Sequence, residues 1–185
     1  MKKLLILILV LILVVVGASA LYTVLGQEQA PDQLATQPPT PTGETQALTM
    51  APDITVYDAN GNEVKLSDYF GKPIVLNFWA SWCGPCQSEM PDFQDKFLEL
   101  GDEVQFLMVN MTDGSRETLE DATGFIAGKG YTFPVFYDTA SDAAITYQVY
   151  SLPTTYFIDA QGYLIAQGSG ALDSQTLQKG IDMIR

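Results

Sequence analysis

The most informative stretch of the sequence is residues 75–86, Val75-Leu-Asn-Phe-Trp-Ala-Ser-Trp-Cys-Gly-Pro-Cys86. Together with Ile74, its first half forms an apolar run, interrupted by one asparagine, that is typical of a central strand buried on both faces. Its second half fits the start of a helix, because Pro85 lacks the backbone N–H that a first helical turn leaves unpaired. The stretch therefore predicts a buried strand over residues 74–80 that leads into a helix over residues 84–100.

The two cysteines fall on the first turn of that predicted helix. Residues three apart on a helix are neighbours, so Cys83 and Cys86 can form a small disulfide ring without movement of the backbone. We expect Cys83 to face the unpaired N–H groups and the positive end of the helix dipole, which stabilise a thiolate. Cys86 would be shielded and able to attack a mixed disulfide formed at Cys83, while Gly84 would let a partner chain approach.

Two other roles for a C-x-x-C pair stay open at this point. An inert structural disulfide is common in exported proteins, although so small a ring constrains the unfolded chain little. Half a zinc site would need further ligands, and the chain has no histidine and no third cysteine. A pair that opens a helix directly after a buried strand favours redox catalysis, so we expect no metal and no cofactor besides the Cys83–Cys86 disulfide.

Composition excludes several other functions. The 185 residues include 22 acidic and 9 basic side chains, which gives a formal net charge of -13. A nucleic-acid-binding surface needs clustered positive charge, so we expect no nucleic-acid partner. The absence of histidine excludes triads and proton shuttles that depend on an imidazole.

Composition also divides the chain into three parts. Residues 1–25 hold two lysines and then an uncharged apolar run, which predicts a transmembrane anchor; a signal peptide cleaved near Ala20 is the alternative. Either reading keeps the lysines in the cytoplasm and exports the remainder. Residues 26–51 contain four prolines, five glutamines, five threonines and no aromatic residue, which predicts a disordered linker. Residues 52–185 would form one compact domain.

The predicted elements of this domain indicate an α/β fold, a mixed sheet covered by helices on both faces. Residues 54–58 and 63–66 flank Asn60-Gly61, which predicts an N-terminal β-hairpin. Further strands are expected over residues 104–111, 134–137, 154–159 and 163–167, and helices over 141–148 and 173–184. Another helix is expected over residues 115–129, with Ser115 as its cap and Glu117, Glu120 and Asp121 in its early turns.

Residues 75–86, together with Glu89-Met-Pro91 and Leu152-Pro-Thr154, resemble the active-site signature of the thioredoxin superfamily. The asparagine in the strand, the hairpin and the membrane anchor make the chain most similar to the TlpA/ResA group of extracytoplasmic thiol-disulfide oxidoreductases. The resemblance implies a thioredoxin-like fold, Cys83 as the nucleophile and Cys86 as the resolving cysteine. It also implies that Pro153 is a cis-proline beside the cysteines, and that Leu152 and Pro153 contact the substrate.

The same resemblance implies partners and a location. Electrons would come from a membrane thiol-disulfide donor, and protein disulfides would be reduced at the extracytoplasmic face of a bacterial cell membrane. Some members of the group reduce the cysteines of apocytochrome c before haem attachment, so the resemblance makes cytochrome c biogenesis one expected role. We expect the protein to act as a monomer.

Asn77 and Glu89 mark a difference from cytoplasmic thioredoxins. The buried aspartate of those proteins corresponds to Asn77, which cannot take a proton. The resemblance assigns that role to Glu89, three residues after Cys86; an ordinary acid that interacts with the helix dipole is the alternative. Trp82, next to the cysteine pair, is expected to border the reactive sulfur, with Gly84 and Pro85 supporting the active site.

The direction of electron flow also stays open. Gly84-Pro85 places no cation between the cysteines to stabilise a thiolate, which favours a reductase over an oxidase. A disulfide oxidase or isomerase of the same compartment is the first alternative, and a redox-inactive anchored binding domain is the second. A peroxidase is disfavoured because its Pro-x-x-x-Thr-x-x-Cys pattern is absent.

Overall fold

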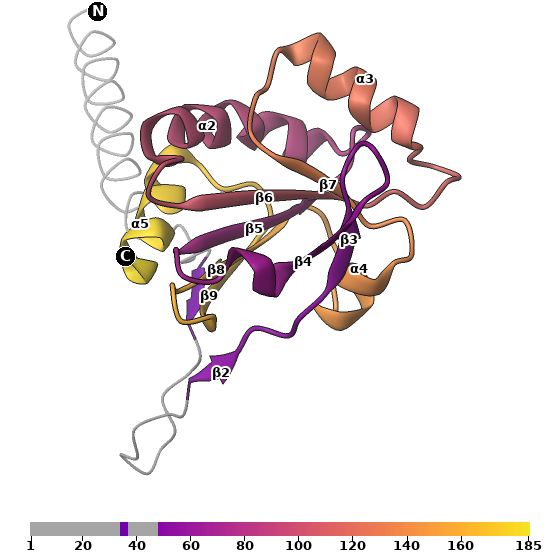
Figure 1. Cartoon of the computed structure of the whole chain (residues 1–185). Helices are drawn as coiled ribbons and strands as arrows, with labels where there is room; N and C mark the ends of the chain where they lie inside the picture. The colour runs from indigo at the N-terminus through magenta and orange to yellow at the C-terminus, as the bar shows by residue number, and fades with distance from the viewer. Residues whose placement is uncertain (1–33, 37–47) are drawn as a thin grey trace, which may run out of the picture. The chain divides into compact units, whose positions relative to one another are not determined.

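The computed structural model describes residues 34–36 and 48–185, which fold around one mixed β-sheet (Figure 1). The strand order is β1-β9-β8-β5-β6-β7-β3-β4, and β2 also pairs with β9. The strands are β1 (Leu34–Thr36), β2 (Thr49–Met50), β3 (Thr55–Tyr57), β4 (Glu63–Lys65), β5 (Ile74–Trp79), β6 (Gln105–Asn110), β7 (Val135–Tyr137), β8 (Thr154–Ile158) and β9 (Tyr163–Ser169).

Strand β5 lies at the centre of the sheet, and the chain that leaves it leads into the two cysteines. It pairs in parallel with β6 and antiparallel with β8, and all six of its residues are buried. Its side chains alternate between two cores, Val75 and Trp79 on one face and Ile74, Leu76 and Phe78 on the other. The unbroken apolar run of the sequence reflects this burial on both sides.

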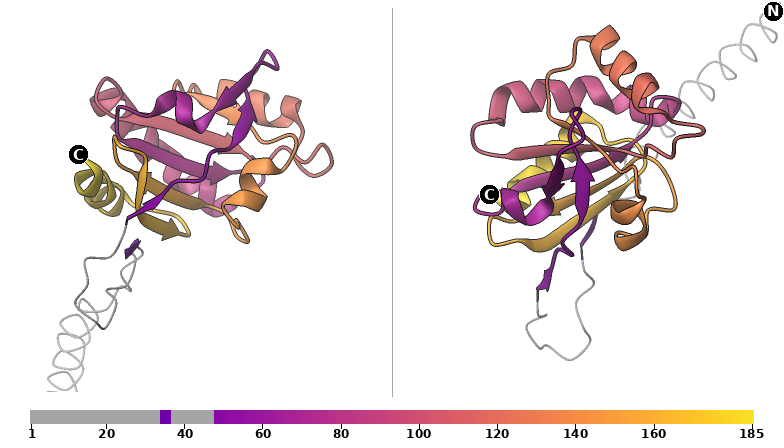
Figure 2. Two further views of the ribbon diagram at one scale, coloured as in Figure 1. Left: turned by 60° about the horizontal axis from the view of Figure 1, so that its bottom comes forward. Right: turned by 45° about the vertical axis from the view of Figure 1, so that its right-hand side comes forward.

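The helices cover both faces of the sheet (Figure 2). Helices α2 (Gly84–Leu100), α3 (Leu119–Lys129) and α5 (Ser174–Ile184) pack on the face of Val75, and the 3-10 helix η1 (Leu66–Tyr69) and α4 (Asp142–Thr146) pack on the opposite face. The predicted fold class is therefore confirmed. The predicted hairpin is also present as β3 and β4, joined by a turn in which Gly61 has a φ of +81°.

The segment 26–51, predicted to be a disordered linker, contains two strands. Both β1 and β2 pair antiparallel with β9, and Leu34 and Ala51 are buried. Backbone hydrogen bonds to an open sheet edge require neither aromatic nor β-branched side chains, so composition does not reveal such pairing. The ordered domain thus starts before Pro52. Residues 1–33 and 37–47, including the predicted anchor, lie outside the described residues.

The predicted cap of α3 is wrong. The helix begins at Leu119, and its cap is Thr118, whose hydroxyl accepts the N–H of Asp121 while the Asp121 carboxylate accepts the N–H of Thr118. Ser115 lies instead in a preceding loop, residues 113–117, in which Gly114 has a φ of +71°. Reciprocal capping at Thr118 and the turn at Gly114 fix the helix start four residues later than the prediction.

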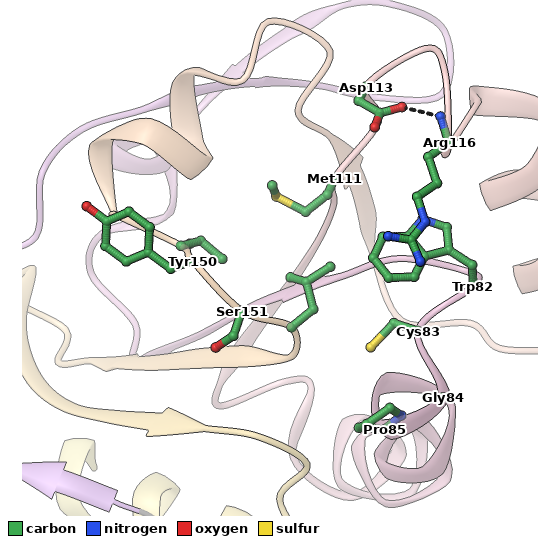
Figure 3. Close-up of a pocket in the computed structure, with 11 residues that line it drawn as sticks. Trp82, Cys83, Gly84, Pro85, Met111, Asp113, Arg116, Tyr150 and Ser151 are labelled. Atoms are coloured by element: carbon green, nitrogen blue, oxygen red, sulfur yellow. Dashed lines mark hydrogen bonds between the residues drawn. The ribbon is translucent and has the colours of Figure 1, made fainter.

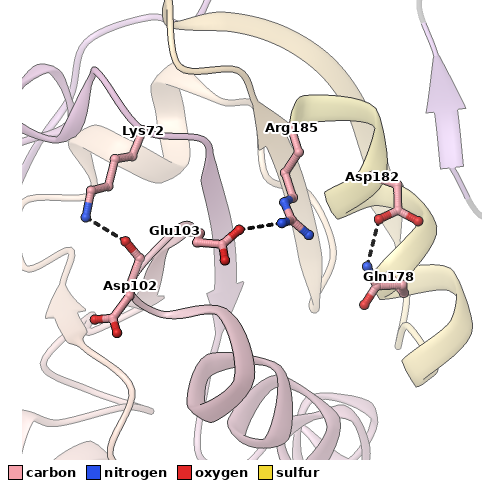
Figure 4. Close-up of polar contacts among 6 residues, drawn as sticks. All are labelled: Lys72, Asp102, Glu103, Gln178, Asp182 and Arg185. Carbon is pink, nitrogen blue, oxygen red and sulfur yellow. Dashed lines mark hydrogen bonds and ion pairs between the residues drawn. The ribbon is translucent and has the colours of Figure 1, made fainter.

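Surface contacts tie the end of α5 to the loop before β6 (Figure 4). Arg185 forms an ion pair with Glu103, and Lys72 donates a hydrogen bond of 2.8 Å to the carbonyl of Asp102 in the same loop. Exposed pairs of this kind contribute about 0–1 kcal/mol each, so the fold depends mainly on its two cores. Within the described ranges, no helix combines the length and the apolar character needed to cross a bilayer.

Candidate active site

The cysteine pair lies where β5 ends and α2 begins. The Cys83 N–H donates to the carbonyl of Ala80, closing a four-residue turn, residues 80–83, that we call the active-site turn. Cys83 caps α2, and its sulfur accepts the N–H of Cys86 at 3.2 Å. The two sulfur atoms are bonded to each other, with Cα atoms 5.2 Å apart. Cys86 has no exposed surface, whereas Cys83 borders a groove.

This groove, of about 490 Å³, is the surface from which a partner can reach Cys83 (Figure 3). One wall is Trp82, which is 41% exposed, and the other is residues 149–152, in which Tyr150 is 89% exposed. Its remaining lining is Gly84, Pro85, Met111, Asp113 and Arg116. The groove is open and partly aromatic, so it suits an extended polypeptide segment.

The Leu152–Pro153 peptide bond is cis, which is the isomer that the resemblance implies. Leu152 lines the groove opposite the cysteine pair, and the buried Pro153 immediately precedes β8. The absence of a Cβ at Gly84 leaves space, since a Cβ built there meets no atom within 4 Å. The predicted residues Trp82, Cys83, Gly84 and Leu152 are therefore brought together at one groove.

Arg116 was not singled out by the sequence, although it lies at the rim of this groove. Its guanidinium carbon is 3.4 Å from the centre of the Trp82 ring, a cation–π contact (Figure 3). The sequence analysis considered only the two residues between the cysteines, Gly84 and Pro85, neither of which carries a positive charge. A segment 30 residues away supplies that charge, and no pattern within residues 75–86 could have indicated it.

Asn77 and Glu89 are buried side chains of β5 and α2, the two elements that flank the cysteine pair. Asn77 Nδ2 donates to Glu89 Oε1 at 2.9 Å and to Thr155 Oγ1 at 3.0 Å, while Asn77 Oδ1 is buried without a hydrogen-bond partner. The other carboxylate oxygen of Glu89 accepts the N–H of Leu172 at 2.9 Å. These contacts join the centre of β5, the first turns of α2, β8 and the loop before α5.

Burial gives Glu89 unusual acid–base properties. Its side chain is only 1% exposed, and this desolvation raises the pKa of Glu89 to about 7, against the opposing hydrogen bonds from Leu172 and Asn77. A carboxyl group with this pKa can both accept and release a proton near neutral pH. An acid that interacted only with the helix dipole would be exposed. The geometry therefore favours the other role considered for Glu89, that of the group that takes up a proton.

Glu117 is a second buried carboxylate that the sequence placed wrongly, on the early turns of a helix. It has no exposed surface and accepts hydrogen bonds from the Ser81 N–H and hydroxyl, each at 2.8 Å, and from Asn110 Nδ2 at 2.7 Å. A correct helix start at Thr118 would have placed Glu117 before the helix. Its contact with residue 81 depends on tertiary structure alone.

Among the described residues, no group of three or more histidine, cysteine or acidic side chains is arranged to hold a metal ion.

A family model described as AhpC/TSA matches residues 48–167. The chain belongs to the AhpC/TSA family. Among curated relatives of this AhpC/TSA protein, the thiol-disulfide oxidoreductase ResA of Geobacillus kaustophilus is 33% identical, over 73% of this chain and 76% of its own length. The ResA of Bacillus subtilis is 30% identical over 73% of this chain and 74% of its own.

Solved structures give the same result. The exposed lipoprotein thioredoxin Etrx1 of Streptococcus pneumoniae is 32% identical with a TM-score of 0.62, covering 71% of this chain and 98% of its own. A DsbF homologue from Corynebacterium diphtheriae is 31% identical with a TM-score of 0.62, covering 79% of this chain and 97% of its own. The predicted resemblance to thioredoxin-like proteins of the ResA group is confirmed. This AhpC/TSA-family protein is a thiol-disulfide oxidoreductase of the ResA type.

Proposed function

We propose that the protein reduces disulfide bonds in exported proteins, with Cys83 as the attacking cysteine and Cys86 as the resolving one. The observation that carries this proposal is the asymmetry of the pair: Cys83 borders the groove at the start of α2, and Cys86 is enclosed behind it. A polypeptide in the groove can reach only the first sulfur. The second sulfur can reach only the first, because the two are neighbours on one helical turn.

The reaction balances as two successive exchanges. The Cys83 thiolate attacks one sulfur of the substrate disulfide, forming a mixed disulfide and releasing the other substrate sulfur as a thiolate. Cys86 then loses its proton and attacks the Cys83 sulfur, which breaks the mixed disulfide and releases the second substrate thiolate. The substrate disulfide gains two electrons, and the Cys83–Cys86 dithiol is oxidised to the disulfide.

Glu89 is the proton acceptor of the second exchange in this proposal. It lies one helical turn beyond Cys86, it is buried, and its pKa of about 7 suits a general base at neutral pH. Asn77 holds the carboxylate in place and cannot take the proton itself.

The direction of electron flow is proposed from charge. An ionised Glu89 close to Cys86 in a buried site disfavours the thiolate and therefore the reduced pair, which makes the reduced protein a better reductant. The positive charge of Arg116 favours a thiolate and therefore the reduced pair, but Arg116 is exposed, so solvent and salt screen its charge. A disulfide oxidase or isomerase remains the alternative, and it would require the cation to outweigh the buried carboxylate.

The cellular setting is part of the same proposal. The apolar segment 1–25 would hold the domain at the outer face of a bacterial membrane, and a membrane thiol-disulfide donor would re-reduce the Cys83–Cys86 disulfide. Among substrates, the cysteine pair of apocytochrome c fits because it must be reduced before haem attachment. The resemblance to the ResA group supports this choice, whereas the names of the ResA relatives support only the exchange of thiols and disulfides.

Trapping in cells tests the assignment of the two cysteines. A Cys86→Ser variant should accumulate disulfide-linked adducts with its substrates, because the resolving attack is lost. The matched Cys83→Ser variant should accumulate none. Adducts on the Cys83→Ser variant alone would reverse the two roles.

The reduction potential tests the direction. A reductase should equilibrate near the roughly -270 mV of thioredoxin, and an oxidase near the roughly -120 mV of the strong periplasmic oxidants. The reduced full chain should also reduce insulin disulfides. A potential near the oxidant value would establish the alternative instead.

A further inference from the structure

Ser81, in the active-site turn, is held through every polar group it has. The backbone N–H and the hydroxyl of Ser81 each donate to the Glu117 carboxylate at 2.8 Å. The carbonyl oxygen of Ser81 accepts a hydrogen bond of 2.6 Å from Gln87 Nε2. Gln87 belongs to α2, whereas Glu117 belongs to a loop from another part of the chain. The turn is therefore fixed both to the helix that follows it and to the body of the domain.

Glu117 is itself held in position. Asn110, the last residue of β6, donates to Glu117 Oε1 at 2.7 Å, and Asn110 Oδ1 accepts the hydroxyl of Thr112 at 2.6 Å. Asn110 and Glu117 have no exposed surface, and Thr112 is buried as well. A buried carboxylate that accepts three hydrogen bonds is a fixed point, because moving it would leave those donors unpaired.

The loop that carries Glu117 is rigid as well. The Asp113 carboxylate oxygen Oδ1 accepts the backbone N–H groups of Ser115, Arg116 and Glu117, at 2.7, 2.7 and 3.0 Å. The loop meets the active-site turn at two adjacent residues, because Arg116 stacks on the Trp82 ring while Glu117 binds Ser81.

We propose that Glu117 is a positioning residue, which holds the active-site turn so that the Cys83 sulfur keeps its hydrogen bond from the Cys86 N–H. That bond, 3.2 Å from N to Sγ, helps to stabilise the Cys83 thiolate. Since Ser81 and Trp82 are the two central residues of a turn that ends at Cys83, a shift of Ser81 displaces the sulfur directly. This inference rests on the proposed role of Cys83.

The geometry supplies a conservative variant. Glu117→Gln can keep all three contacts, because its oxygen can accept the Ser81 and Asn110 N–H groups and its amide can donate to the Ser81 hydroxyl oxygen. Glu117→Ala keeps none. Ser81→Ala loses only the hydroxyl contact. The series therefore separates the geometry of the contact from its charge.

The readout is the rate of alkylation of Cys83 by iodoacetamide against pH, measured on the full chain in a Cys86→Ser background, where Cys83 is the only thiol. A displaced sulfur loses the N–H, so Glu117→Ala should raise the midpoint of the alkylation profile by roughly half to one pH unit. Deletion of a negative charge alone would lower it. Glu117→Gln should not raise the midpoint, and Ser81→Ala should raise it less than Glu117→Ala.

Activity gives a second readout in the chain with both cysteines. Glu117→Ala should lower kcat/KM for insulin reduction by about 10-fold or more, as expected for a misplaced nucleophile, and Glu117→Gln should restore it to within about twofold. Glu120→Ala, which removes an exposed acid from α3, is the matched control. If the unaltered chain fails to reduce insulin, the proposed function fails, but the alkylation profiles still test the positioning role.

Three outcomes would overturn the proposal. The first is that the midpoint of the alkylation profile falls equally in Glu117→Ala and Glu117→Gln, and the second is that it does not move in a folded Glu117→Ala protein. The third is that Glu117→Gln lowers kcat/KM for insulin reduction as much as Glu117→Ala does. Should Glu117→Ala fail to fold, the pair Glu117→Gln and Ser81→Ala decides. An unshifted Ser81→Ala profile would then reject the proposal.

Discussion

Asn77 and Glu89, 12 residues apart in the sequence, are joined by a hydrogen bond of 2.9 Å between Nδ2 and Oε1. The bond links a strand side chain that cannot change its protonation to a helix side chain that titrates near neutral pH. Asn77 Nδ2 also donates to Thr155 Oγ1 at 3.0 Å, so contacts on two sides fix the orientation of the amide. The titrating carboxyl group is therefore held in place by a side chain that takes no part in the titration.

The first prediction concerns proton removal from Cys86. Glu89→Gln should slow the resolution of a mixed disulfide by about 10²-fold or more, the usual loss when a general base is removed. In the unaltered protein the resolution rate should rise with pH through about 7, the pKa of Glu89, and this inflection should be missing from the variant. Rapid-mixing kinetics on a preformed mixed disulfide measures both. Glu99→Gln, an exposed acid on the same helix, is the control, and superimposable profiles for all three proteins would reduce Glu89 to a structural role.

The second prediction concerns stability against pH. The pKa of Glu89 rises from about 4.5 in the unfolded chain to about 7 on folding, so the folded state favours the protonated form. Its contribution to stability is fully present below pH 4.5 and is lost as the pH rises to 7, a change of about 3 kcal/mol. Between pH 5 and pH 8, the unfolding free energy of the oxidised protein should therefore fall relative to that of Glu89→Gln. Urea unfolding at several pH values measures the difference, and parallel curves for the two proteins would contradict it.

The third prediction tests where α3 begins. Thr118→Ala should cost about 1 kcal/mol of unfolding free energy, because the hydroxyl of Thr118 accepts the N–H of Asp121. Ser115→Ala should change stability by less than about 0.5 kcal/mol, since Ser115 is exposed and lies outside the helix. Denaturant unfolding of the two variants provides the comparison. A larger effect at Ser115 would restore the start of the helix that the sequence predicts.

The fourth prediction concerns the contact between α5 and β8. A Cβ at Gly180 would lie 2.3 Å from the ring of Phe157, a buried residue of β8, so Gly180→Ala should cost about 1–3 kcal/mol through overpacking. Gly124→Ala is the matched control, because a Cβ there meets no atom within 4 Å in the exposed middle of α3. That change should stabilise the protein by about 0.5–1 kcal/mol. Thermal unfolding of both variants measures the effects. Equal changes in unfolding temperature for the two variants would show that the Phe157 ring moves to make room for the added Cβ.

The parts of the fold that sequence reasoning predicted well are those with strong local signals. The buried strand and the helix after it follow from an apolar run and a proline, and the helix over residues 84–100 agrees with α2. The hairpin follows from Asn60-Gly61. These signals act over a few residues and need no knowledge of the remaining chain.

The parts that were missed depend on distant contacts. Strands β1 and β2 exist because β9 offers an open edge, and at three and two residues they are too short for an alternating pattern to indicate them. Arg116 and Glu117 belong to a loop that meets residues 81 and 82 only after β5 and β6 have paired. For Glu89, spacing along a helix indicated the distance from Cys86, whereas its burial and the raised pKa required the packed domain.

Strand β9 would have a mechanical consequence under the anchoring proposed for residues 1–25. Because Leu34, Ala35 and Thr36 of β1 pair with Gly168, Gln167 and Ala166 of β9, tension transmitted along the chain before residue 34 loads these three pairs first. Strands β9 and β8 stand between β1 and β5, which carries the active-site turn. A pull on such a tether would thus be resisted at the margin of the sheet, two strands away from β5.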